Sequence, residues 1–539
     1  MFSSDSTKRD RTRILVWSLV VGAMLFLLVP ITYYSNSDSY MRYAKFLLGS
    51  KQEMYFRSPG YPFLLLLSGV FAFDSFLGLM LAQLAMGVLM PLLVYEIIAS
   101  YDRRVAYYAG LASIGSLIPY GFMKAILTEQ LYMLALLLAI WAATRFFSTK
   151  RIRYFYMASV VFFMLLLIRP VAQYMFVIFL LTTLAFEFRA RRRIAIHVLC
   201  AFVVIVLLIE GWAGLRNRLM PDANVQASAM NMTNMTGRLL FYNVYQAGGH
   251  WNNDVLFSGE RFDQRRDFIR SSDGPASAQL ISAVRANLTP ERAAFGGRHL
   301  TQSTAEAEFF YGKYGAHLDA LADEILRSPS LSYYFFLWRV LDDVLGPVAT
   351  DRLFLRLSLE ILRARPSLGP RYVLRNVYFF ALGLSADYIH SLHPNYNLKV
   401  SQPNLAGIVS YTPMRPDDVL SPRLAREVGF QLGGEVNARI RKALYLVWAP
   451  LYLLVRPAVF VLMLLGAFVL WRTTYAAVAI LALLIVVYQM LVVCVFVMPI
   501  DRYVLETVLV ELLVAAPATV GVVKWTAGWE PAVRGVEAG

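Results

Sequence analysis

The sequence predicts an all-α protein that crosses a membrane many times. Of its 539 residues, 58% are hydrophobic, and the mean hydropathy is +0.53. A soluble protein of this length needs more polar surface to cover its core. Apolar runs of about 20 residues, the length of a membrane-spanning helix, recur along the chain. Because the bilayer offers no water to backbone groups, these runs must be helical.

The positive charge of the chain is concentrated in short loops. The net charge is +15 at pH 7, but Arg and Lys cluster between the apolar runs, so the charge indicates membrane orientation rather than nucleic-acid binding. Lys8, Arg9, Arg11 and Arg13 precede the first run and place the N-terminus in the cytoplasm. The run Leu15–Tyr33 is long enough to span and no small-residue cleavage site follows it, so we expect an uncleaved first helix.

The apolar runs predict a bundle of about 10–11 transmembrane helices. The expected spans are 14–33, 77–99, 105–122, 129–147, two short spans forming a hairpin over 154–188, 194–214, 444–471, 474–498 and 503–524. After the first span we expect a short helix in the membrane interface, since Tyr40, Tyr43, Phe46 and Leu47 fall at helical spacing. A dipping helix follows over 61–73.

Charge and hydropathy divide the chain into four regions. We expect an N-terminal transmembrane catalytic module at 1–214, an extracytoplasmic domain at 215–440, further transmembrane helices at 441–525 and a cytoplasmic tail at 526–539. The extracytoplasmic domain is charged and punctuated by proline, and we predict it to be mostly helical. Amphipathic pieces of it, including 371–384, are expected to rest on the bilayer.

Several polar side chains are predicted to meet at the outer face of the membrane. Asp38 follows the first span, Glu129 begins the fourth, and Arg502 begins the last. Arg57 joins them from Arg-Ser-Pro-Gly-Tyr-Pro, where two prolines turn the chain back towards the membrane. A carboxylate beside apolar walls can act as a general base, and an arginine fork matches phosphate oxygens. Such a site suits a lipid phosphate whose tail stays in the bilayer.

Each of these residues taken alone also has a structural interpretation. Asp38 can be a solvated helix cap, and Glu129 can be favoured by the dipole at the start of its helix. Arg502 can extend to the membrane surface, and Arg57 can bind lipid headgroups. Only their order along the chain favours a catalytic site.

Two further carboxylates lie inside the last predicted span. Glu506 and Glu511 are costly to bury in a membrane, so we expect them to face a polar interior. They can line an acceptor cavity or pair with arginines such as Arg169.

The remaining candidates for metal or redox chemistry have structural interpretations. Cys200 and Cys494 lie in apolar segments and are expected to be small buried hydrophobes. His197 inside a span is interpreted as a hydrogen-bonded packing residue. His390 and His393 have the spacing of a helical metal pair, but we interpret them as solvated.

The order of these motifs resembles that of a known superfamily. Asp38 followed by Tyr40 and Ala44, and then Arg57-Ser-Pro-Gly-Tyr-Pro62, resembles the start of the GT-C superfamily, membrane glycosyltransferases that use polyprenyl-phosphate sugars. The similarity is to the bacterial branch related to protein O-mannosyltransferases and lipid A aminoarabinose transferases. Further matches are Thr128-Glu129-Gln130, Leu167-Ile168-Arg169-Pro170 and Arg502-Tyr503. The resemblance covers roughly 10–190 and the last span, and 215–440 carries no part of it.

The resemblance implies a role for each matching residue. Asp38 would be the general base of an inverting transfer from a polyprenyl-phosphate donor. Glu129 would orient substrate or help with a divalent metal ion. Residues that would hold the donor phosphate are Arg57, Lys124 and Arg502. Residues that would line the substrate cavity are Tyr40, Tyr61, Arg169 and Tyr503. The family often has a second acidic residue after the base, where this chain has Ser39, and this leaves metal dependence open.

Other functions are weighed against the glycosyltransferase. A transporter or lipid flippase often has two related halves, and this chain shows no half-repeat. An O-antigen ligase or polymerase shares the many spans and the outer loop, but relies on an Arg-rich loop and a histidine. A non-catalytic scaffold is a third alternative. The expected setting is a bacterial inner membrane, with a lipid, glycan or protein acceptor on the extracytoplasmic face and no nucleic-acid partner.

Overall fold

The computed structural model is built from helices. It describes residues 4–33, 35–49, 58–219, 237–238, 240–241, 244, 269–287, 326, 337, 341, 344–382, 420–428, 434–495 and 501–526. In these ranges extended pairing is limited to a single parallel bridge between Thr32 and Ala125. The predicted all-α class is therefore confirmed.

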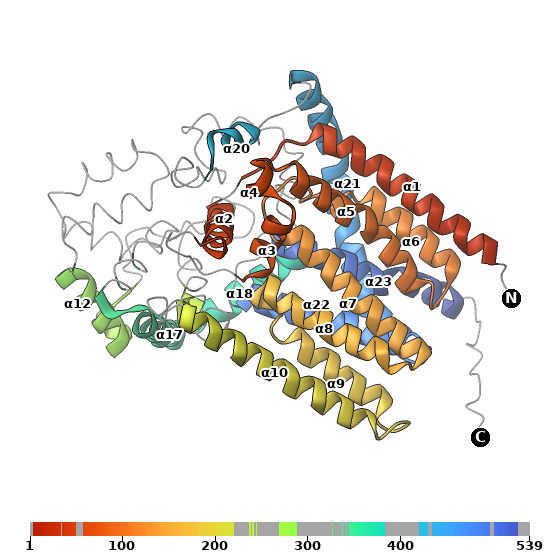
Figure 1. Ribbon diagram of the computed structural model, residues 1–539. Helices are drawn as coiled ribbons and strands as arrows, with labels where there is room; N and C mark the ends of the chain where they lie inside the picture. Colours follow the sequence, from red (N-terminus) through yellow and green to blue (C-terminus); the bar gives the residue numbers. More distant parts are fainter. Residues whose placement is uncertain are drawn as a thin grey trace.

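Ten described helices run between the two ends of one bundle (Figure 1). They are α1 (Ser4–Leu28), α5 (Leu77–Ile98), α6 (Arg103–Gly115), α7 (Glu129–Thr149), α8 (Ile152–Ile168), α9 (Met175–Glu187), α10 (Ile194–Leu219), α21 (Gly434–Val469), α22 (Ala476–Val495) and α23 (Asp501–Thr526). Seven of them are long and apolar enough to cross a membrane, whereas α8 and α9 are shorter apolar helices and α6 has only 13 residues. The protein is thus a multi-pass membrane protein, as predicted.

The two ends of the bundle differ in chemistry. The arginines and lysines of 8–13, 103–104, 145–153 and 189–193 gather where α1 begins and α23 ends, and we call this the basic end. The opposite end, called the distal end, holds α2 (Ser35–Leu47), α3 (Gly60–Leu67), α4 (Val70–Phe73) and the start of α7. Cationic loops on a single side of a bundle follow the positive-inside rule.

Local sequence sets where several of these helices begin and break. The Asp102 carboxylate accepts hydrogen bonds from the backbone N–H groups of Arg104 and Val105, at 2.8 and 3.0 Å, and so caps α6. The predicted span 105–122 is shorter than expected, because α6 ends at Gly115 and Leu117 has a left-handed φ of 57°. The predicted dipping helix over 61–73 is interrupted at Gly69, whose φ of 73° favours glycine.

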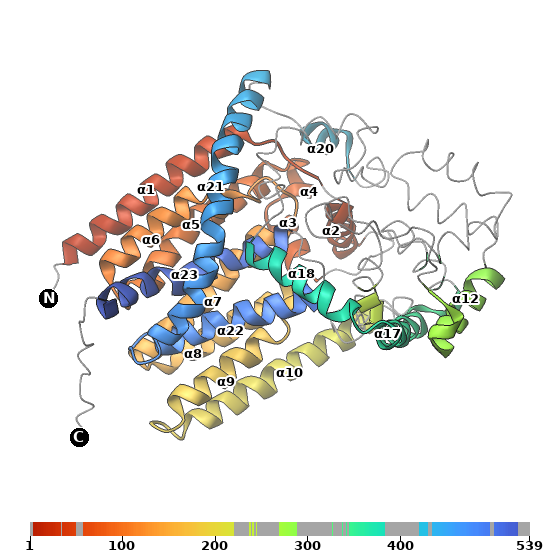
Figure 2. The ribbon, with the colours of Figure 1, turned by 180° about the vertical axis from the view of Figure 1, so that it is seen from behind.

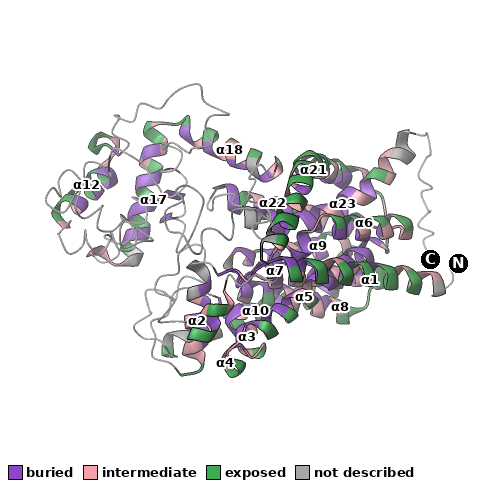
Figure 3. Ribbon diagram, turned by 90° about the horizontal axis from the view of Figure 1, so that it is seen from above, coloured by how far each residue is buried: buried purple, intermediate pink, exposed green. Residues whose placement is uncertain are grey.

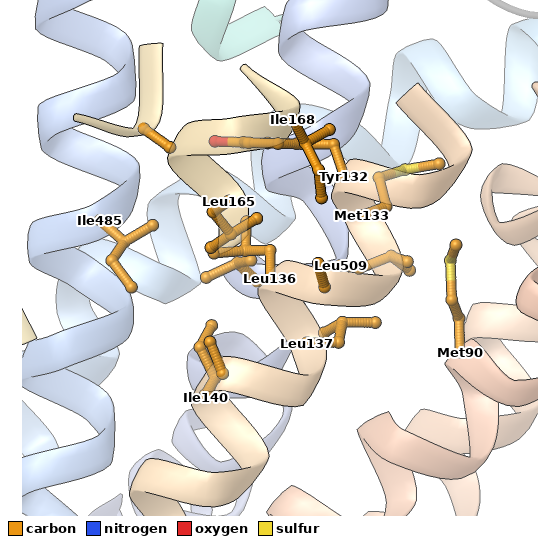
Figure 4. Packing of buried hydrophobic residues seen from close by; sticks show 14 of the residues in the cluster. Met90, Tyr132, Met133, Leu136, Leu137, Ile140, Leu165, Ile168, Ile485 and Leu509 are labelled. Atoms are coloured by element: carbon orange, nitrogen blue, oxygen red, sulfur yellow. The ribbon is translucent and has the colours of Figure 1, made fainter. Parts of the chain in front are cut away.

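The centre of the bundle is α7, which packs against α5, α8, α22 and α23. Figure 4 shows Leu136 and Ile140 of α7 beside Leu165 of α8 and Ile485 of α22, with Leu509 of α23 close by. Burial is concentrated between these helices, and α1 presents an exposed face outward (Figure 3). Exposed apolar side chains on outer helices are what a lipid-facing surface requires.

Helix α21 crosses the other helices on one side of the bundle (Figure 2). It starts at Gly434, about ten residues before the predicted span 444–471, and packs closely on α23. The Arg456 guanidinium of α21 pairs with Glu511 of α23, with both side chains fully buried, and donates to the Phe380 carbonyl at 3.1 Å. Glu511 is thus paired with an arginine, which is one of the two roles expected for it.

The segment between α10 and α21 has a separate hydrophobic cluster. It is centred on α12 (Pro275–Asn287), α17 (Pro347–Ala364) and the start of α18 (Leu368–Leu382). Glu360 of α17 accepts hydrogen bonds from the first backbone N–H groups of α12, at 2.9 Å. Helix α18, predicted as an amphipathic piece, packs on α21 and α22, and Asn376 donates to the Cys494 carbonyl at 2.9 Å. The predicted domain boundaries stay predictions.

Two smaller predictions have different outcomes. His197 forms a hydrogen bond with the Tyr156 hydroxyl at 2.7 Å, as expected of a packing residue. Cys494 is buried as predicted, but the prediction for Cys200 is wrong, because Cys200 is exposed on α10. Hydropathy does not tell a lipid-facing position from an interior one. His390 and His393 lie outside the described residues.

We expect Gly466→Ala to destabilise the protein. A Cβ at Gly466 of α21 would lie 2.6 Å from the Ala518 Cβ and 3.0 Å from the Val514 carbonyl oxygen of α23, so the two helices must separate. Overpacking of this kind costs about 1–3 kcal/mol. The control is Gly211→Ala in α10, where a Cβ meets no atom within 4 Å. Thermal unfolding in detergent measures both, and equal midpoints would contradict the packing of α21 on α23.

Candidate active site

The segment after α1 is tied to the loop that leads into α7. The Thr32 N–H donates to the Lys124 carbonyl at 2.9 Å, and the Ile126 N–H donates to the Thr32 carbonyl at 3.1 Å. The buried Ser37 hydroxyl then donates to the Ile126 carbonyl at 2.7 Å. Asp38 follows Ser37 on the first turn of α2. The tie therefore holds the backbone of Asp38 beside the entrance to α7.

A buried amide of α5 organises the same loop. Gln83 Nε2 lies 2.9–3.2 Å from the carbonyl oxygens of Phe122, Met123 and Ala125, and its Oε1 accepts from the Tyr61 hydroxyl at 3.0 Å. Buried carbonyl groups must find donors, so one amide satisfies a turn that has no regular structure of its own. Gln83 thereby links α3, α5 and the loop before α7.

Aromatic contacts join the interfacial helix to the dipping helix. The rings of Tyr40 on α2 and Tyr61 on α3 pack edge to face, with centroids 5.1 Å apart. Both side chains are buried. Two of the three tyrosines predicted to line the substrate cavity, Tyr40 and Tyr61, therefore lie together at the distal end.

Arg169 lies between two buried carboxylates. Its Nη2 donates to Glu129 Oε1 at 2.8 Å, and its Nη1 pairs with Glu506 Oε1. Glu506 also accepts from Gln489 Nε2 at 3.0 Å. Glu129 and Glu506 are at most 1% exposed, so Glu129 is not the solvated residue of a helix mouth. Of the two roles expected for Glu506, the pairing with Arg169 is present.

This cluster joins distant parts of the chain. Glu129 begins α7, Arg169 ends the α8 side of the α8–α9 hairpin, and Glu506 lies on α23. Buried charges are stable only when they are paired and hydrogen-bonded, because each loses its hydration. The cluster therefore fixes the hairpin tip and the last span relative to the start of α7.

Lys124 is the described cation on the loop before α7. Its Nζ lies 4.5 Å from the centroid of the Phe26 ring of α1, and its carbonyl accepts from Thr32. Burial lowers the pKa of Lys124 to about 8, because the surroundings disfavour the charged form. Within the described structure, Lys124 is thus a cation that can lose its proton in mildly alkaline solution.

The structure brings most of the described candidates to one end of the bundle. Tyr40, Tyr61, Lys124, Glu129 and Arg169 are all at the distal end. Arg57 lies outside the described residues, as do the side chains of Asp38, Arg502 and Tyr503, although their backbones begin α2 and α23.

Sequence reasoning missed two residues that support this site. Gln83 and Gln489 each place a single amide inside an otherwise apolar span, and both are buried. Burying an isolated amide in a membrane span costs free energy unless the amide is hydrogen-bonded. A lone glutamine in an apolar run was therefore the sequence signal that could have identified both residues. Across the described ranges, no group of three or more His, Cys, Asp or Glu side chains is arranged to hold a metal ion.

The sequence model of the family described as dolichyl-phosphate-mannose-protein mannosyltransferase matches residues 57–212. The predicted resemblance to GT-C glycosyltransferases is confirmed over this region. The matched residues include Glu129, Arg169 and the loop that Gln83 organises. No curated protein matches the chain. Among solved structures, the chain is similar to the crystal structure of ArnT from Cupriavidus metallidurans bound to undecaprenyl phosphate, with 12% identity and a TM-score of 0.32, over 96% of this chain and 78% of that one.

We expect Arg169→Met to destabilise the protein strongly, since it leaves Glu129 and Glu506 buried without this cation. Removing one partner of a buried ion pair costs about 3–5 kcal/mol. Adding Glu129→Gln and Glu506→Gln to the same chain removes both negative charges and should restore most of the lost stability. Thermal unfolding in detergent compares the three proteins. A single variant as stable as the parent would show that the cluster does not hold the helices together.

Proposed function

We propose that the protein is an inverting glycosyltransferase that moves one sugar from a polyprenyl-phosphate donor to an extracytoplasmic lipid, glycan or protein. The observation that carries the proposal is the tie between Thr32, Ser37 and the 124–126 loop. It sets the turn bearing Asp38 beside the entrance to α7, within the bundle that carries the family match. The polar cluster there lies at the end of the bundle opposite the cationic loops, which is the outer side under the positive-inside rule.

In the proposed reaction Asp38 is the general base. The acceptor hydroxyl oxygen attacks the anomeric carbon of the donor sugar while its proton passes to the Asp38 carboxylate. The bond between that carbon and the phosphate oxygen breaks, and the electron pair leaves with the polyprenyl phosphate. A single displacement from the opposite face inverts the configuration at the anomeric carbon.

The departing phosphate gains negative charge and needs cations near it. Arg57, Lys124 and Arg502 are assigned this role, because charged donors aimed at the developing charge lower the barrier. Lys124 is the best placed of the described groups, since its loop is hydrogen-bonded directly to the segment that leads to Asp38. Glu129 is assigned to orienting substrate, and its carboxylate is fixed in position by Arg169.

We expect Asp38→Asn to reduce sugar transfer by about 10²–10⁴-fold, the usual contribution of a general base. Binding of the donor should change little, since the amide keeps the size of the carboxylate. Ser39→Ala is the neighbouring control and should retain transfer. Mass spectrometry of envelope glycans from a deletion strain carrying each variant gives the readout in cells. Transfer that survives both Asp38→Asn and Glu129→Gln would overturn the assignment of the reaction to this site.

The efficiency kcat/KM for the donor should fall as the pH rises through about 8. Lys124 is protonated below its lowered pKa and neutral above it, so a phosphate-binding charge is lost as the solution becomes alkaline. Lys124→Arg keeps the charge at higher pH, and the fall should move upward or disappear. Initial rates at low donor concentration between pH 6.5 and 9.5 test this. A profile that is the same for both proteins would exclude Lys124 from donor binding.

A further inference from the structure

A cavity of about 360 Å³ lies at the basic end of the bundle. It is formed by the turn between α7 and α8 together with the turn between α9 and α10. The Arg169 cluster is at the other end of these helices, because α8 ends at Ile168 and α9 starts at Met175. The cavity is therefore separate from the proposed active site.

The cavity is lined by an excess of positive charge. Lys150, Arg191, Arg192 and Arg193 all border it. Lys150 pairs with the buried carboxylate of Glu187, and Arg191 donates to the Lys150 carbonyl at 2.9 Å. Arg192 and Arg193 are exposed, and in the described part of the chain no carboxylate pairs with either. Glu187 therefore leaves most of this charge uncompensated.

Apart from His197, the rest of the lining is apolar and continues into the lipid-facing surface. Phe146, Ile152 and Ile194 form the wall beside the cations. Further along, α8 and α10 expose apolar side chains such as Val160 and Leu199, which are 60% and 62% exposed. A hydrogen bond between Tyr156 and His197 joins these two helices next to the cavity. The cations thus lie at the basic end of an apolar surface that faces the lipid hydrocarbon.

The combination matches the two parts of an anionic phospholipid. Arginine forks bind phosphate oxygens, and basic pockets between membrane helices attract anionic headgroups. Free phosphate would use the cations but not the apolar surface, and a zwitterionic lipid carries no net charge to match them. We propose that this cavity holds the headgroup of an anionic phospholipid, with its acyl chains along α8 and α10.

Bound lipid would join two helical hairpins. Its phosphate would contact the α7–α8 and α9–α10 turns together, adding to the contacts of Lys150 with Glu187 and Arg191 and to the hydrogen bond between Tyr156 and His197. A ligand that binds only the folded protein stabilises it. Anionic lipid should therefore raise the stability of the whole membrane bundle.

The test uses the full chain in nanodiscs of phosphatidylcholine with increasing phosphatidylglycerol. Phosphatidylglycerol should raise the unfolding midpoint of the parent protein, and Arg192→Gln with Arg193→Gln should weaken its binding by roughly tenfold or more. The control is Arg9→Gln with Arg104→Gln, which removes the same charge from exposed arginines at the same end but outside the cavity. This control should retain the response to lipid.

Two further measurements distinguish an anionic lipid from other ligands and from a general effect of charge. Inorganic phosphate and glycerol 3-phosphate, added to protein in pure phosphatidylcholine, should give little stabilisation. An effect as large as that of phosphatidylglycerol would overturn the lipid assignment. Equal losses in the cavity variant and in the control would show a general effect of charge and would also overturn it. Arg192→Lys with Arg193→Lys, which keeps the charge, should preserve part of the lipid response and shows that the position tolerates substitution.

Discussion

The arrangement at the distal end depends on one buried cation and the two carboxylates that it holds. Arg169 contacts Glu129 and Glu506, which lie 40 residues before it and 337 residues after it in the sequence. Charges removed from water must find opposite charges, so this contact restricts how α7, the α8–α9 hairpin and α23 can pack. Most of the remaining described interior is apolar, apart from groups such as the Arg456–Glu511 pair and Gln83, and apolar packing alone is less specific about which helix faces which.

A second constraint acts on the loop before α7, which lies deep in the protein without regular structure. Its carbonyl groups are satisfied by Gln83 and by the segment around Thr32. Irregular backbone at such depth is tolerated only where the protein supplies the missing partners. The same hydrogen bonds that satisfy the loop also bring the start of α2 to it. The segment that bears the proposed catalytic residue is thus positioned by polar groups that also satisfy the fold.

The cationic turns at the basic end carry the charge that orients the protein in the membrane. They also form an exposed surface whose positive charge is largely not neutralised by carboxylates. Arg192 and Arg193 follow the rule that sets membrane topology, and they also border a cavity that continues into an apolar face. The two roles are compatible, because orientation depends only on where the charge lies, whereas binding depends on how the side chains are placed. The proposed active site and the proposed lipid site lie at opposite ends of the same hairpins.

The sequence by itself determined the all-α class, most of the spans and the alignment of Glu129 with the start of a helix. Span length, hydropathy and loop charge are local properties, and the bilayer leaves few alternatives for them. The sequence also offered Arg169 as a partner for Glu506, since charges in spans must be compensated. Only the tertiary structure decided that one arginine serves both glutamates, that Gln83 supports the loop, and that Cys200 faces outward. Those facts depend on which faces of distant helices meet, and this is set by packing across the whole bundle.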